Sequence, residues 1–114
     1  MKRNFEKNIH VLNQLMGYCK RIGGSEIHSK FIIEGEKTHI TVSVIKSDID
    51  SHDIDELRKQ LAISRQPEVE EDYWNLGLSG NMGDEMSLVG MMTDTTEVMY
   101  EDDTLTIIVE RHDD

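Results

Sequence analysis

Two stretches of alternating apolar and polar residues, each interrupted by a two-residue turn, constrain the fold of this chain most strongly. In residues 27–44, Gly35-Glu36 fits a hairpin turn with glycine at its first central position. This turn places Phe31 opposite Ile40 and brings the inward apolar residues of both arms to one face. Turn chemistry and apolar pattern therefore predict the same register for an antiparallel hairpin.

A second hairpin is predicted near the end of the chain, over residues 96–111. A turn at Asp102-Asp103 pairs Tyr100 with Leu105, and it pairs Val98 with Ile107. The chain therefore contains four strands in two antiparallel pairs.

Apolar residues spaced three and four apart predict helices over residues 3–22 and 67–76. A short helix between them is opened by residues 48–53, with Asp50 or Ser51 as its cap and Ile54, Leu57 and Leu61 as its apolar stripe. Residues 84–92 fit a short helix or a strand, and both interpretations remain open. The predicted order is α-β-β-α-α-(α)-β-β. We expect a single α+β domain over residues 1–114, with a four-stranded antiparallel sheet from two β-hairpins and helices on one face.

The first predicted helix has two apolar stripes, which together cover about half of its circumference. The first stripe is Phe5, Ile9, Leu12, Met16 and Cys19, and the second stripe is Val11, Leu15, Tyr18 and Ile22. One sheet covers a face only a little over 100° wide. We therefore expect a homodimer in which the second stripe makes the contact. A charge introduced at Leu15 would then dissociate the dimer, whereas one at Lys30 would not.

Charge is distributed unevenly along this acidic chain, whose formal net charge is −11. Eleven of the twelve Lys and Arg residues lie at or before Arg65, and only Arg111 follows among fourteen acidic residues. A half so acidic repels phosphate, which argues against nucleic-acid binding. It fits a solubilising face, or a docking surface for a basic partner or for the more basic half of a second copy. A nucleic-acid mimic and a cation-binding surface are the remaining interpretations.

Motifs for catalysis, cofactors and metals fail on residue type or spacing. The single Cys excludes an intramolecular disulfide and a four-thiolate metal site. The acidic stretch from Asp48 has Asp53 and Lys59 where a calcium loop needs Gly and Glu. Glycines at 77, 80 and 83 lack the lysine of a phosphate loop. We predict no catalytic residues, no cofactor and no metal ligands.

Five of the seven Met residues fall between Met82 and Met99. Methionine side chains fill irregular cores, and they also suit surfaces that accept varied partners. On the second interpretation, the partner-binding residues are Trp74, Met86, Met91 and Met92.

These observations favour a non-enzymatic protein-interaction or regulatory module, which binds a second copy of itself and a basic or apolar protein segment. The alternative is a domain that binds a small molecule or a divalent cation near the glycine-rich loop 77–90. No apolar run reaches the length of a membrane span, and the N-terminus lacks the apolar core of a signal peptide. A cytoplasmic location without membrane contact is therefore the expectation.

Overall fold

A computed structural model of the chain describes residues 4–75 and 85–113, with only the backbone at residues 73–75 and 85. Helix α1 (Asn4–Arg21) precedes the hairpin of strands β1 (Ile27–Glu34) and β2 (Lys37–Ile45). Three helices follow, namely α2 (Ser51–Leu61), α3 (Pro67–Asn75) and α4 (Glu85–Met91). The hairpin of β3 (Thr95–Glu101) and β4 (Thr104–His112) ends the fold. Of the two interpretations left open for residues 84–92, the structure shows the helix, over residues 85–91.

The four strands form one antiparallel sheet in the order β1-β2-β4-β3, so the two hairpins lie side by side. Both predicted registers are confirmed, with Phe31 opposite Ile40 and Tyr100 opposite Leu105. The turns explain the agreement: Gly35 has φ 61°, and Asp102 and Asp103 have φ values of 49° and 59°. Positive φ at these positions gives the turn twist that matches paired strands.

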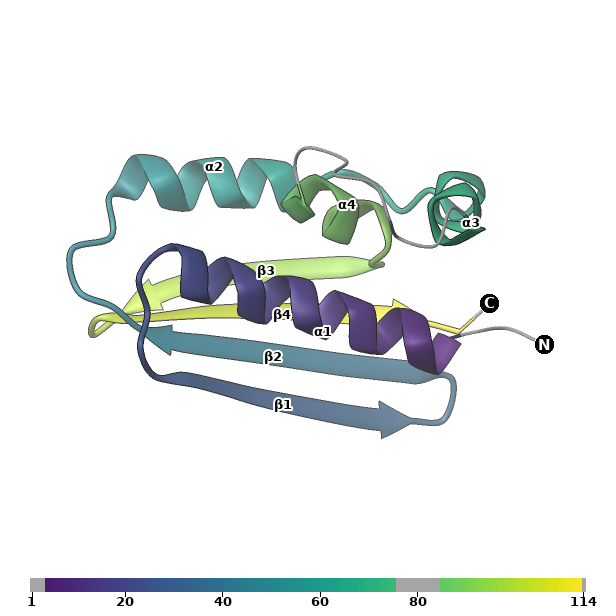
Figure 1. Cartoon of the computed structure of the whole chain (residues 1–114), viewed down its shortest axis with the longest axis horizontal. Coiled ribbons are helices and arrows are strands. Elements are labelled where there is room, and N and C mark those ends of the chain that lie inside the picture. Colours follow the sequence, from purple (N-terminus) through teal and green to yellow (C-terminus); the bar gives the residue numbers. More distant parts are fainter. Residues whose placement is uncertain (1–3, 76–84, 114) are drawn as a thin grey trace.

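The helices lie on one face of the sheet, as Figure 1 shows, and the predicted α+β fold is confirmed. Alternate residues of β2 and β4 point toward the helices and are fully buried, among them Ile40, Val42, Leu105 and Ile107. The buried apolar residues form one cluster that also takes in side chains of α1, α2 and α4. Each such side chain contributes roughly 1.5–3 kcal/mol by leaving water.

Helix α1 packs on the sheet along the boundary between its two apolar stripes. Val11 and Leu15 of the second stripe and Cys19 of the first are fully buried. Phe5 of the first stripe reaches toward β1, where its ring meets the edge of the Phe31 ring at a centroid distance of 6.0 Å. Tyr18 and Ile22 of the second stripe remain half-buried on the side that faces α2. The sheet therefore covers the middle of the apolar face and leaves both flanks partly open.

Candidate functional site

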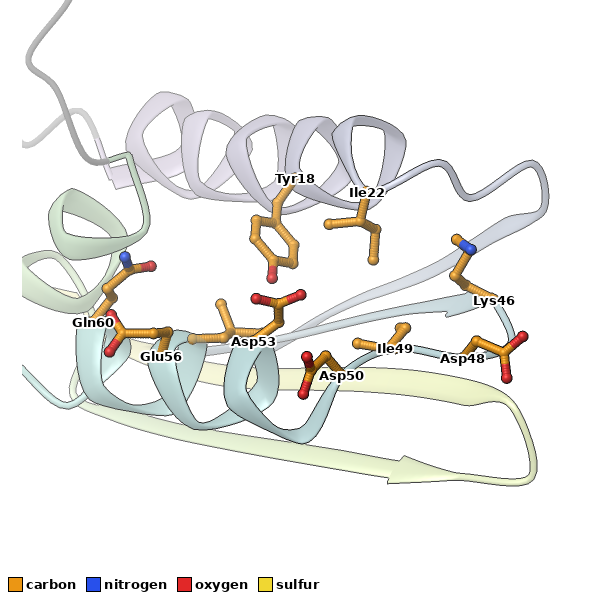
Figure 2. Close-up of a pocket in the computed structure, with 10 residues that line it drawn as sticks. Tyr18, Ile22, Lys46, Asp48, Ile49, Asp50, Asp53, Glu56 and Gln60 are labelled. Atoms are coloured by element: carbon orange, nitrogen blue, oxygen red, sulfur yellow. The ribbon is translucent and has the colours of Figure 1, made fainter.

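A pocket of about 500 Å³ lies between the C-terminal half of α1 and the start of α2 (Figure 2). Its apolar lining consists of Ile22, Ile49 and Leu57. Its acidic lining consists of Asp48, Asp50, Asp53 and Glu56, and the remaining lining residues are Tyr18, Lys46 and Gln60. Four carboxylates and one ammonium group thus surround a partly apolar cavity.

The acidic side of the pocket follows from the way in which α2 begins. Asp50 is the N-cap of this helix, and its side chain accepts a hydrogen bond of 2.9 Å from the backbone N–H of His52. Asp53 and Glu56 follow at intervals of three residues, which keeps the three carboxylates on one side of the helix. The same residues that start the helix therefore line the pocket.

The loop that joins β2 to α2 is held in place by a tyrosine of β3. The Tyr100 hydroxyl donates to the carbonyl oxygen of Lys46 at 2.8 Å and accepts from the backbone N–H of Ile49 at 3.3 Å. Between these two residues, Asp48 has a φ of 61°, a conformation that aspartate adopts more readily than most residues. Tyr100 thus fixes the pocket wall that carries Lys46, Asp48 and Ile49.

The opposite wall of the pocket comes from α1. Figure 2 shows the hydroxyl of Tyr18 pointing toward the carboxylate of Asp53 across the cavity. Burial raises the pKa of the Tyr18 phenol, and the negative charge of Asp53 raises it further. Asp53 thus places a negative charge beside the Tyr18 phenol at this wall of the pocket.

An acidic rim around an apolar lining suits a ligand with a hydrocarbon stem and a cationic head. Lysine and arginine side chains have this construction, as do organic amines. Within the described part of the chain, no group of three His, Cys, Asp or Glu residues could hold a metal ion. The combination of apolar and acidic lining residues therefore fits an organic cation.

A second group of polar residues is buried at the other end of α1, and we call Lys7, Asn8, Glu70 and Arg111 the buried polar cluster. Glu70 and Arg111 are both 0% exposed, and their closest salt-bridge distance is 3.3 Å. Lys7 lies 3.1 Å from Glu70, and the Arg111 guanidinium also donates to Asn8 and to the carbonyl oxygen of Met92. This cluster connects α1, α3 and β4.

The buried polar cluster was not expected from the sequence. Glu68 and Glu70 both lie in the first turn of α3, as acidic residues often do at a helix start, yet the structure buries Glu70 and exposes its neighbour Val69. One signal was present in the strand pattern. Arg111 continues the inward row of Leu105, Ile107 and Val109, so an arginine had to be buried with a partner.

The residues of the expected dimer contact lie partly in the core of the chain and partly in the lining of the pocket. Val11 and Leu15 are fully buried in the core of a single chain, so neither offers surface to a second copy. Tyr18 and Ile22 line the pocket instead. The second stripe is therefore covered largely within the chain, because α2 and α4 lie on that side of α1.

Two of the expected partner-binding residues, Met86 and Met92, do not lie on the surface. Met86 and Met92 are buried in the core, which is the core-filling role of methionine, while Met91 is half-buried. The side chain of Trp74 lies outside the described residues, as do residues 77–84 of the glycine-rich loop. Met86 and Met92 are therefore not available to contact a partner protein.

No family model matches the chain, and no curated protein matches its sequence. None of the helices within residues 4–75 and 85–113 is long and apolar enough to cross a membrane.

Proposed function

We propose that this chain is a non-enzymatic protein-interaction module that binds a basic segment of a partner protein. The observation that carries the proposal is the acidic pocket between α1 and α2. A lysine or arginine side chain of the partner enters this pocket. Its hydrocarbon stem contacts Ile22, Ile49 and Leu57, and its charged head lies among the carboxylates.

The charge of the pocket lining supports this choice of ligand. Negative charges gathered in a cleft with apolar walls produce a stronger field than the same charges on a flat surface. The chain supplies four carboxylates there against the single ammonium group of Lys46. The excess negative charge attracts a cation and repels phosphates and acidic peptides.

A non-enzymatic role is supported by the state of the only thiol. Cys19 is 0% exposed, and burial raises its pKa to about 11, so a thiolate is scarce near neutral pH. We also retain the proposal that the chain forms a homodimer. The alternative function, binding of a small molecule, takes the form of a free organic cation in the same pocket.

Calorimetric titration with a short peptide that carries one arginine between leucines tests the proposal. The same peptide with citrulline keeps the shape of the side chain but removes its charge. We expect the arginine peptide to bind and the citrulline peptide to bind about tenfold more weakly, since several charge pairs of up to about 1 kcal/mol each are lost. Equal binding of the two peptides would contradict the proposal.

A matched pair of variants locates the binding site. Asp53→Asn with Glu56→Gln removes two carboxylates from the pocket, and we expect about a tenfold loss of peptide affinity. Asp55→Asn with Glu68→Gln removes the same charge from exposed positions outside the lining, and we expect less than about a twofold change. Equal losses in both variants would show attraction by net charge alone. Binding of 1,5-diaminopentane but not of the peptide would favour the small-molecule alternative.

A further inference from the structure

Strand β1 forms an open edge of the sheet, because β2 is the only one of the described strands that pairs with it. Glu34 and Lys37 flank the two-residue turn, and the backbone N–H of Ile45 donates to the carbonyl oxygen of Glu26. Even-numbered residues of β1 therefore bond to β2, and the backbone groups of Ile27, Ser29, Phe31 and Ile33 face outward. Such a row of backbone donors and acceptors is a template for another strand.

Large apolar side chains accompany this open edge. Ile32 is 41% exposed and Ile33 is 57% exposed, on opposite faces of β1. Phe5, which lies over β1 against Phe31, is 58% exposed. Behind Phe5 along α1, Ile9, Leu12 and Met16 of the first stripe are half-buried. Apolar surface thus continues from the strand onto the helix.

We propose that a second copy of this chain pairs with this edge, β1 against β1 and antiparallel, with the two-fold axis at Ile32. This inference rests on the proposed homodimer and is independent of the pocket. In this register Lys30 lies opposite Glu34 of the second copy, and Phe31 lies opposite Ile33 of the second copy. Each contact occurs twice, as a two-fold interface requires.

The charges of β1 select this register. Moving the axis by one residue in either direction separates Lys30 from Glu34 of the second copy. It also places the apolar side chain of Ile32 opposite Lys30 or opposite Glu34. Opposite charges directly across an antiparallel pair are stabilising, and like charges are destabilising. The pattern Lys30-Phe31-Ile32-Ile33-Glu34 is therefore complementary to itself.

The other edge of the sheet lacks this complementarity. The exposed side of β3 carries Glu97 and Glu101 and no basic residue. Two copies of β3 that pair with each other would place acidic side chains close together. The charge pattern thus favours β1 over β3 as the contact.

Pairing about this axis also accounts for the wide apolar face of α1. Residues directly opposite each other in this register have the same parity, so the helices of both copies lie on one face of a continuous sheet. The two α1 helices then flank the two-fold axis, with Phe5 and the first stripe of each directed toward the other copy. The first stripe, rather than the second, makes the contact between copies.

Disulfide cross-linking tests both the surface and the register. Ile32 of each copy forms a non-hydrogen-bonded pair on the axis, with Cα atoms about 4.5 Å apart, which is within the range of a disulfide. Ile32→Cys should therefore form a covalent dimer under mild oxidation. Ile33→Cys is the matched control, because this position is more exposed than Ile32 and lies two residues out of register with itself. Wild-type Cys19 is buried and should give no cross-link.

Light scattering after size exclusion tests the dimer without cross-linking. We expect wild-type protein at tens of micromolar to have twice the 13.1 kDa mass of the chain. Ile32→Lys should weaken the dimer at least about tenfold, since two ammonium groups then meet on the axis. The control Ile63→Lys changes an exposed isoleucine outside the sheet and should have no effect.

Charge reversal completes the test. Lys30→Glu should weaken the dimer, opposite to the expectation from sequence, and combining it with Glu34→Lys should restore it. Circular dichroism verifies that each variant is folded. A monomeric wild-type protein, or a dimer that is indifferent to Ile32→Lys and Lys30→Glu, would overturn the proposal. Loss of the dimer with unchanged peptide binding would leave the pocket proposal intact.

Discussion

At the scale of single residues, the buried charges around Glu70 depend on each other most strongly. Burial alone would raise the pKa of Glu70, but the positive charges of Arg111 and Arg65 hold it below its ordinary value. Burial alone would lower the pKa of Lys7, but hydrogen bonds to Glu71 and Glu70 raise it. Each ion is stabilised by its neighbours in place of water.

Glu70→Gln is therefore expected to destabilise the chain by about 3–5 kcal/mol, because Arg111 and Lys7 stay buried without their shared carboxylate. The free energy of unfolding in urea measures this. Glu68→Gln on the same helix changes an exposed side chain, and its effect should stay within about 0.5 kcal/mol. Similar losses of unfolding free energy in both variants would contradict the claim that Glu70 stabilises the buried charges of Arg111 and Lys7.

The same variant should change how stability depends on pH. A depressed pKa in the folded state stabilises the chain above the ordinary pKa of glutamate, about 4.3, and this stabilisation is lost as pH falls through the folded value. As pH falls from about 5 through the folded pKa of Glu70, the wild-type protein should therefore lose more stability than Glu70→Gln. Parallel curves for the two proteins would contradict the ionised state of Glu70.

At the scale of elements, the sequence alone predicted the registers of both hairpins, but it did not predict which side of α3 is buried. The hairpin registers were predictable because turn residues and alternation gave the same answer at Gly35 and at Asp102-Asp103. Helix α3 was predicted at nearly the right residues, but its buried side was not. Its position is set by the salt bridges of Glu70 to α1 and β4, and such long-range partners leave no periodic signal.

Two glycines should respond in opposite ways to the same substitution. A Cβ atom at Gly90 would lie 2.9 Å from the backbone carbonyl oxygens of Gln60 and Leu61, where α4 contacts the end of α2. Gly90→Ala should therefore cost about 1–3 kcal/mol through overpacking. A Cβ atom at Gly17 in α1 has ordinary contacts, and Gly17→Ala should add about 0.5–1 kcal/mol. Urea unfolding of both variants checks the pair, and a stabilising Gly90→Ala would refute the close contact.

At the scale of the whole molecule, α1 separates two surfaces with different chemistry. Tyr18 and Ile22 face the acidic pocket, while Phe5 and Ile9 belong to the stripe beside the open edge of β1. The width of the apolar face of α1 predicted two contacts and assigned the second stripe to a second copy, whereas the structure buries Val11 and Leu15 of that stripe within the chain. The pocket was not predictable, because the acids from Asp48 to Glu56 fit an ordinary helix start and no sequence pattern places α1 opposite them.

The central claim is that a cationic side chain enters the pocket between α1 and α2, and chemical-shift mapping by NMR tests it most directly. On addition of the arginine peptide, the methyl signals of Ile22, Ile49 and Leu57 and the ring signals of Tyr18 should move, while those of Ile63 and Val69 should not. The citrulline peptide should produce these shifts only at higher concentration. Shifts confined to residues outside the pocket, or no shifts with the arginine peptide, would contradict the account.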